Sequence, residues 1–277
     1  MSSVSPIQGT TMSKTNKFIL WCVMVAVASF WVWAGAVSWL SKPLFDQENL
    51  NNFGVFAIVL IVLLCLLSFG FILFKGKKES LVLSGIVGAT FFSVFGVSNF
   101  YLLGVTILVL LFIHSDDVVS GEIRERLKIN PRILLRKSLP NLVLGLFVLI
   151  SFAAFYSPAI ESYKNLQELP SASNVFIKNI VEQTLSGQLA QIENQQKEIV
   201  LNQVTQEIIK EANLWLEPYF QFAPPALAFG LFLVLWGVGW IFIWLAVFLG
   251  ILVFQILKKT KFFNIEEYDI KAQKITI

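Results

Sequence analysis

Charge-free apolar runs, each long enough to cross a bilayer, constrain this chain more than any other feature. They contain no Asp, Glu, Lys or Arg and cover residues 18–40, 53–74, 81–113, 139–156 and 225–257. About 20 consecutive apolar residues in a helix span the hydrocarbon core of a membrane. Only 14% of the residues are charged, against about a quarter in soluble domains. The sequence therefore predicts an all-α integral membrane protein.

The run over residues 81–113 is too long for one ordinary span and only just long enough for two. Gly96-Val97-Ser98-Asn99 offers a turn near its middle. Basic residues decide between one crossing and two, because short cytoplasmic loops are enriched in Lys and Arg. The basic clusters at residues 75–78 and 124–137 share a side only if the run crosses and returns. We therefore expect a short helical pair or a re-entrant pair here, and about six transmembrane helices in three hairpins.

Six crossings place both termini on the cytoplasmic side of a plasma (inner) membrane. Most of the 21 Lys and Arg residues, including every arginine, then lie on that side. The expected organisation is a disordered cytoplasmic N-terminus over residues 1–17, transmembrane helices 1–5 within 18–157, an extracytoplasmic helical segment over 158–224, transmembrane helix 6 over 225–257 and a cytoplasmic tail over 258–277.

A cleaved signal peptide is the alternative interpretation of residues 1–36. Lys14 and Lys17 precede an apolar stretch, and Ala34-Gly35-Ala36 resembles a small-residue cleavage site. The apolar run continues to Leu40 and is rich in tryptophan, which favours an uncleaved first span. Both interpretations stay open on the sequence alone.

One long polar segment interrupts the apolar chain between residues 157 and 225. Within residues 174–216, apolar side chains recur at steps of three or four, the spacing of one helical face. Such a face needs a cover, which can be a second helix, another copy, a partner or the membrane surface. The expected partner-binding residues are Val181, Leu185, Leu189, Ile192, Val200, Val204 and Ile208.

The exact form of this segment stays open between one long helix and an antiparallel helical hairpin. The average apolar step of about 3.8 residues drifts away from the 3.5-residue repeat of a left-handed coiled coil. A regular parallel two-stranded coil is therefore disfavoured. A break near residues 193–197 would give the hairpin.

A tryptophan ladder marks the last apolar run, where Trp236, Trp240 and Trp244 recur at every fourth residue. Tryptophan normally lies at the membrane interface, so a ladder in the middle of a span is unusual. It either walls a cleft for lipid or solute, or packs against another helix beside Gly237 and Gly239. In the run over 81–113, a similar spacing of Gly85, Ala89 and Ser93 gives a small-residue face suited to helix contact.

Residues 114–138 form an amphipathic connection that we expect in the lipid headgroup layer. Asn130-Pro131 divides it into two short helices, and Pro140 suits the first turn of the next span. The residues expected to face anionic headgroups are Arg124, Arg126, Lys128, Arg132, Arg136 and Lys137.

No residue pattern favours catalysis, a cofactor or nucleic-acid binding. His114, Asp116 and Asp117 are too close in sequence to converge on a metal without help, and an Asp capping the following helix explains them better. The two cysteines lie inside apolar runs and form no metal-ligand pattern. We therefore expect a protein that is not an enzyme and holds no cofactor or metal.

Two functions remain. The first is a membrane protein that presents residues 158–224 for assembly or partner binding, either with another copy or with a different membrane protein. The alternative is a small channel or exporter for an uncharged or lipid-like solute. The absence of ionisable residues from the apolar runs disfavours ion-coupled transport.

Overall fold

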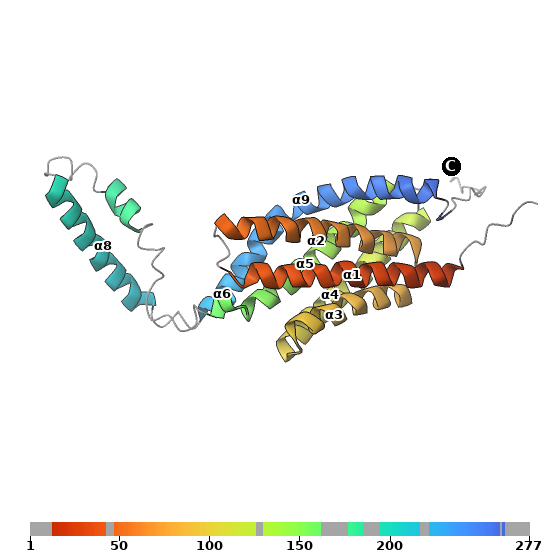
Figure 1. Cartoon of the computed structure of the whole chain (residues 1–277), viewed down its shortest axis with the longest axis horizontal. Helices are drawn as coiled ribbons and strands as arrows, with labels where there is room; N and C mark the ends of the chain where they lie inside the picture. The colour runs from red at the N-terminus through yellow and green to blue at the C-terminus, as the bar shows by residue number, and fades with distance from the viewer. Residues whose placement is uncertain are drawn as a thin grey trace, which may run out of the picture. The chain divides into compact units, whose positions relative to one another are not determined.

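The computed structural model of the chain describes residues 13–42, 47–125, 130–161, 177–184, 194–216, 222–260 and 262–263, and no strand occurs among them. The labelled helices are α1 (Lys14–Leu40), α2 (Gln47–Leu73), α3 (Lys77–Phe95), α4 (Asn99–Glu125), α5 (Pro131–Phe155), α6 (Pro158–Glu161), α8 (Asn194–Leu216) and α9 (Ala223–Lys259). A further helix covers residues 177–184. Within these ranges, α1–α5 and α9 are long and apolar enough to cross a membrane (Figure 1). The predicted all-α membrane protein with six spans is confirmed.

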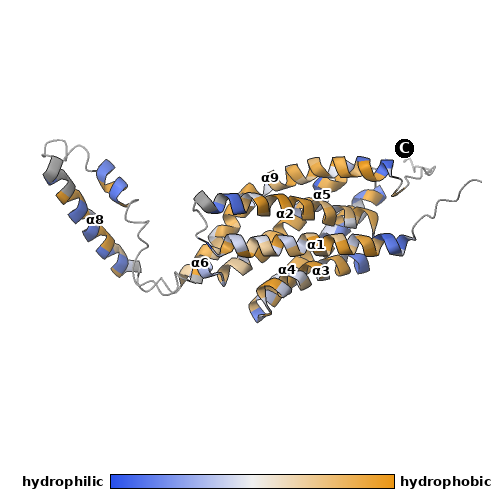
Figure 2. Cartoon of the chain, in the orientation of Figure 1, coloured by the Kyte–Doolittle hydropathy of each residue, from blue (hydrophilic) through white to orange (hydrophobic). Residues whose placement is uncertain are grey.

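The chain divides into two compact units. The bundle unit consists of residues 1–153 and 231–277, and the loop unit of residues 154–230. The bundle unit contains α1–α4 together with most of α5 and α9, and the loop unit contains α8. Figure 2 shows that apolar residues dominate the spanning helices, whereas polar and apolar residues alternate along α8.

Aromatic contacts bring three helix ends together at one end of the bundle. The Phe18 ring near the start of α1 lies 5.1 Å from the Phe74 ring just after α2. The Lys17 ammonium donates a hydrogen bond of 2.7 Å to the Phe262 carbonyl, just beyond α9. Figure 1 shows the start of α1 and the end of α9 at this same end. Lys77 reaches Asp117 of α4 here too, at 4.0 Å. The basic residues at the start of α1, in the α2–α3 turn, near the end of α4 and at the end of α9 therefore lie at one end of the bundle, as six crossings require.

The run over residues 81–113 forms two helices, which confirms the predicted pair. α3 has 19 residues, α4 has 27, and the turn between them covers residues 96–98. Gly96 has a φ of 80°, in the left-handed region that glycine adopts most easily. The Ser98 hydroxyl accepts a hydrogen bond from the Tyr101 amide at 3.1 Å and caps α4. α4 is a full-length helix, however, and not a short one.

The amphipathic connection over residues 114–138 is not a separate pair of short helices. α4 continues through Glu125 and α5 begins at Pro131, so both halves extend the spanning helices. The extension of α4 is held because Ser115 and Val119 are buried in the bundle. Pro140 lies inside α5 and not in its first turn. Prolines are tolerated inside membrane helices, where neighbouring groups satisfy the carbonyl they leave free.

Similar corrections apply at the N-terminus. α1 begins at Lys14, so residues 14–17 are helical and not disordered as predicted, while residues 1–12 lie outside the described residues. The Ser13 side chain accepts a hydrogen bond from the Asn16 amide and caps this first turn.

Several polar side chains inside the bundle are paired between helices. The buried Trp21 indole donates to the Leu66 carbonyl of α2 at 3.0 Å, and the Trp33 indole donates to the Val87 carbonyl of α3 at 3.2 Å. The Ser68 and Ser138 hydroxyls, on α2 and α5, are hydrogen-bonded to each other. Such bonds hold helices together in an environment where apolar side chains gain little from leaving lipid.

Candidate functional sites

The apolar face of α8 is covered over its first half and open over its second. Leu201, Ile208 and Trp215 are separated by seven residues, almost two helical turns, and therefore share a face. Leu201 is 4% exposed, Ile208 is 41% exposed and Trp215 is 78% exposed. Thr205, on the same face beside Leu201, is also buried. The loop unit thus covers the beginning of the face, whereas toward its end Ala212 is half-buried and Ile208 and Trp215 are exposed.

The expected partner-binding residues differ in how deeply the structure buries them. Val181 is buried, Val200 and Val204 are half-buried, and Ile208 is exposed. The centre of the buried part lies at Leu201 and Thr205, one position beyond Val200 and Val204. The remaining three residues lie outside the described part of the chain: Leu185, Leu189 and Ile192. The choice between one long helix and a hairpin also depends on residues 185–193, which the structure does not describe.

The tryptophan ladder lies on the outer surface of α9. Trp236, Trp240 and Trp244 are 62–69% exposed. Gly239 packs instead toward α5, where an added Cβ would lie 3.3 Å from the Phe147 ring. Among the described residues the three indoles therefore lie mainly on the outside of the bundle, open to lipid or to another chain.

An apolar groove lies on the opposite face of α9. Its volume is about 360 Å³. Along α9 its lining residues differ from the ladder positions by about half a helical turn, so the ladder does not wall it. The groove is lined by Trp39, Phe53, Ala57, Ile61, Leu231, Val234, Leu235, Val238, Ile241, Phe242 and Leu245.

The basic residues expected at the headgroup layer keep their cations outside the bundle. Arg132, Arg136 and Lys137 of α5 are exposed, while Leu134 and Leu135 between them are buried. Arg124 is exposed in the last turn of α4. Arg126 and Lys128 lie outside the described residues. The described members thus have the two-faced arrangement of helix ends at a membrane surface.

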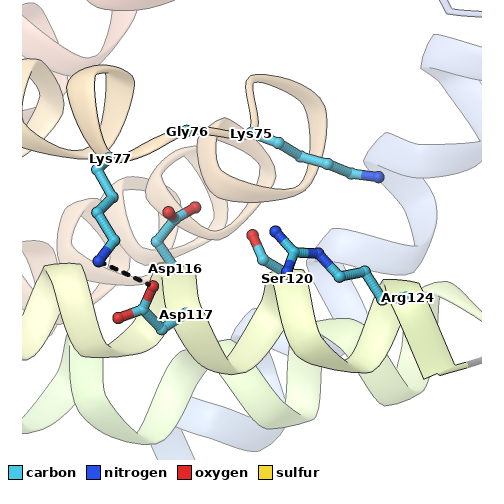
Figure 3. Close-up of a pocket in the computed structure, with 7 residues that line it drawn as sticks. All are labelled: Lys75, Gly76, Lys77, Asp116, Asp117, Ser120 and Arg124. Carbon is cyan, nitrogen blue, oxygen red and sulfur yellow. Dashed lines mark ion pairs between the residues drawn. The ribbon is translucent and has the colours of Figure 1, made fainter.

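A charged pocket, which the sequence did not predict, lies at the end of the bundle that carries the basic clusters. It has a volume of about 290 Å³ and opens between the α2–α3 turn and α4 (Figure 3). Both signs of charge line it. The lining residues are Lys75, Gly76, Lys77, Asp116, Asp117, Ser120 and Arg124.

Asp116 is the least expected member of this pocket. It lies inside α4 and is only 2% exposed, so the expectation that Asp116 or Asp117 caps a following helix is wrong. One of its carboxylate oxygens, Oδ1, has no hydrogen-bond partner among the described residues. The Gly76 backbone donates a hydrogen bond to this carboxylate. Asp117, the next residue, is more exposed and forms an ion pair with Lys77 at 4.0 Å.

The α2–α3 turn that forms one wall of the pocket depends on glycine. Gly76 has a φ of 146°, a conformation that side chains rarely permit. A Cβ at this position would also collide with the Glu79 carboxylate in the first turn of α3. The turn therefore brings Lys75 and Lys77 close to α4 without a side chain between them.

Comparisons with family models, with curated proteins and with solved structures found no match. Among the described residues, no group of three His, Cys, Asp or Glu side chains is placed to hold a metal ion.

Proposed function

We propose that this multi-pass membrane protein is not an enzyme, and that its loop unit binds a second copy of the chain in the same membrane. The supporting observation is the apolar face of α8, which is covered at Leu201 and open at Ile208 and Trp215. Apolar surface facing water costs roughly 25 cal/mol for each Å². Covering the open half against another protein removes that cost.

A second copy is the occupant that a shared membrane favours most. Two copies in one bilayer carry their loop units on the same side, which raises the local concentration of one α8 near the other. A twofold contact also lets one surface serve both partners. α9 adds a wide apolar outer surface, since only 17% of its most apolar stretch is buried, the lowest share among the six described spans.

The membrane and its orientation are part of the same proposal. The end of the bundle that carries Lys17, Lys75, Arg124 and Lys258 faces the cytoplasm of a plasma membrane, because cationic loops are retained there. Residues 158–224 then lie on the extracytoplasmic side. The shared position of the basic clusters supports this orientation.

A charge introduced on each face of α8 tests the proposal. We expect Ile208→Glu to weaken dimerisation at least about tenfold, because more than 1.4 kcal/mol is lost when a carboxylate enters an apolar contact. Gln206→Glu adds the same charge to the opposite, exposed face and is the matched control. Native mass spectrometry in nanodiscs measures the dimer fraction. Equal dimer fractions in both variants would rule the contact out.

The second candidate function is a channel or exporter for an uncharged or lipid-like solute, and the apolar groove favours it. A groove of about 360 Å³ between α2 and α9 has room for part of an acyl chain. Ala57→Phe, which narrows the groove, should then reduce solute flux or lipid co-purification without changing the oligomer. Trp240→Phe on the opposite face of α9 is the control. If neither variant changes flux or bound lipid, the groove carries no such function.

A further inference from the structure

We propose that the charged pocket binds an aminoalkyl phosphate, with the phosphate on Lys75, Arg124 and Ser120 and the ammonium on Asp116. This is the chemistry of a phosphatidylethanolamine headgroup and of free phosphoethanolamine. The proposal is independent of the loop unit, because every lining residue belongs to the bundle unit.

The cationic half of the pocket brings together Lys75 and Arg124, and neither forms an ion pair with a carboxylate within the part of the chain that the structure describes. Partial burial, and to a smaller extent the nearby Arg124 guanidinium, lower the pKa of the Lys75 amine. Ser120 lies one turn before Arg124 on α4 and adds a hydroxyl to the same wall. Two cations and a hydroxyl are the donors that a phosphate needs.

The acidic half of the pocket contains a carboxylate, Asp116, that can bind an ammonium but not a phosphate. Buried carboxylates are almost always satisfied by donors, and an ionised carboxylate can only accept. No described residue donates to the Oδ1 atom of the buried Asp116, whereas Asp117 is paired with Lys77. The pocket therefore lacks one donor at Asp116. A primary ammonium carries three N–H donors and a positive charge, and it fits that position.

The charges exclude simpler ligands. A bare phosphate would meet Asp116 and Asp117 as well as the lysines. A bare cation would meet Lys75, Lys77 and Arg124, and the pocket offers no third carboxylate for a divalent metal. A choline headgroup carries a phosphate but no N–H group for Asp116. A ligand with a phosphate and a protonated amine matches both halves.

The pocket also lies at the depth of lipid headgroups. The apolar runs end at Phe74 in the α2 region and at Ile113 in α4. Lys75 follows Phe74 directly, and Asp116 follows Ile113 by less than one turn, about 4.5 Å along the helix axis. A phospholipid in the adjacent leaflet can therefore place its headgroup here while its chains remain in the hydrocarbon.

Lipid retention on the purified full-length protein tests the site. The protein is mixed with equal amounts of phosphatidylethanolamine, phosphatidylcholine and phosphatidylglycerol, and bound lipids are counted by native mass spectrometry. We expect at least a tenfold preference for phosphatidylethanolamine over phosphatidylcholine.

Asp116→Asn should abolish the preference. Arg124→Gln, at an exposed helix end that tolerates substitution, should weaken retention of phosphatidylethanolamine even if Asp116→Asn does not fold. Lys78→Gln, an exposed lysine outside the pocket, should change neither.

Soluble ligands distinguish the two sources of this chemistry. If free phosphoethanolamine displaces the bound lipid, the pocket recognises the lipid through its headgroup alone. If free phosphoethanolamine binds and phosphatidylethanolamine does not, the soluble molecule is the ligand. Both results support the zwitterion site. A folded wild-type protein that retains both phosphatidylethanolamine and phosphatidylcholine in equal amounts overturns it, and so does one that binds neither phosphatidylethanolamine nor free phosphoethanolamine. So does inorganic phosphate that binds as tightly as phosphoethanolamine, since the ammonium would then contribute nothing.

Discussion

At the scale of single residues, two glycines three positions apart on α3 have opposite surroundings. A Cβ on Gly88 of α3 would lie 2.8 Å from Val105 Cγ1 of α4. Gly85, less than one turn earlier, has no neighbouring atom within 4 Å of such a Cβ. The spacing of Gly85, Ala89 and Ser93 suggested the packed face, but all three are exposed in part or wholly, and the packed face contains Val87 and Gly88.

The open surroundings of Gly85 and the close contact at Gly88 predict opposite effects of a glycine-to-alanine substitution at the two positions. Gly85→Ala should stabilise the protein by up to about 1 kcal/mol, because alanine favours helix. Gly88→Ala gains the same propensity but forces Val105, a stiff β-branched side chain, to move, at a cost of about 1–3 kcal/mol. Thermal unfolding in detergent compares the two variants. Equal melting temperatures would show that the α3–α4 contact is not as close as described.

The lowered pKa of Lys75 predicts how binding to the charged pocket depends on pH. A phosphate prefers the protonated amine, so affinity should fall as the pH rises through the Lys75 pKa. That fall begins at a lower pH than for an ordinary lysine, near 10.4. The other charged groups at this pocket are Lys77, Asp116, Asp117, Arg124 and the nearby Glu79.

Lys75→Arg isolates this titration, because arginine keeps its charge at every accessible pH. We expect phosphoethanolamine affinity measured between pH 7 and pH 10 to fall less steeply in the variant. The ligand amine titrates equally with both proteins and cancels in the comparison. Identical pH profiles would show that Lys75 does not contact the phosphate.

At the scale of elements, sequence patterns located the helices better than they located helix ends and faces. Charge asymmetry was enough to predict the pair α3 and α4, because a single crossing would have put basic clusters on both sides. The end of α4 could not be predicted, since Asp116 looks like a surface residue until the α2–α3 turn is seen to cover it. Burial by a distant segment leaves no local sequence pattern.

The same limit explains the rotation of the buried face of α8. Apolar spacing predicts a face to within about one residue, or 100° of helix rotation. The position of its cover decided that Leu201 and not Val200 lies at the centre. The charged pocket was missed for a related reason, because its residues come from the α2–α3 turn, the first residue of α3 and the end of α4, which the sequence alone does not bring together.

Burial along α8 predicts unequal effects of two alanine substitutions. Leu201→Ala should destabilise α8 by about 2–5 kcal/mol, the range for a buried leucine. Ile208→Ala should cost less than about 1 kcal/mol in the monomer, because its side chain is exposed there. Hydrogen exchange of the α8 amides in monomeric nanodiscs measures both. Equal protection of the α8 amides from exchange in the two variants would contradict the difference in burial between Leu201 and Ile208.

At the scale of the whole molecule, six crossings decide which loops share a side of the membrane. Lys78 follows two spans and Gln196 follows five, so the two must lie on opposite sides. A cysteine at each position reports its side to a membrane-impermeant maleimide, in a background without Cys22 and Cys65. We expect Gln196→Cys to react in intact cells and Lys78→Cys only after permeabilisation. Reaction of both in intact cells would contradict the topology.

The central claim is that residues of the loop unit hold two copies of the chain together. The most direct measurement is the native mass of the protein in nanodiscs, with and without residues 174–216, which a flexible linker replaces. We predict a dimer for the full chain and a monomer for the deletion, with both inserted in the membrane. A dimer in both forms would assign self-association to the bundle. A monomer in both would mean that α8 is covered by something other than a second copy.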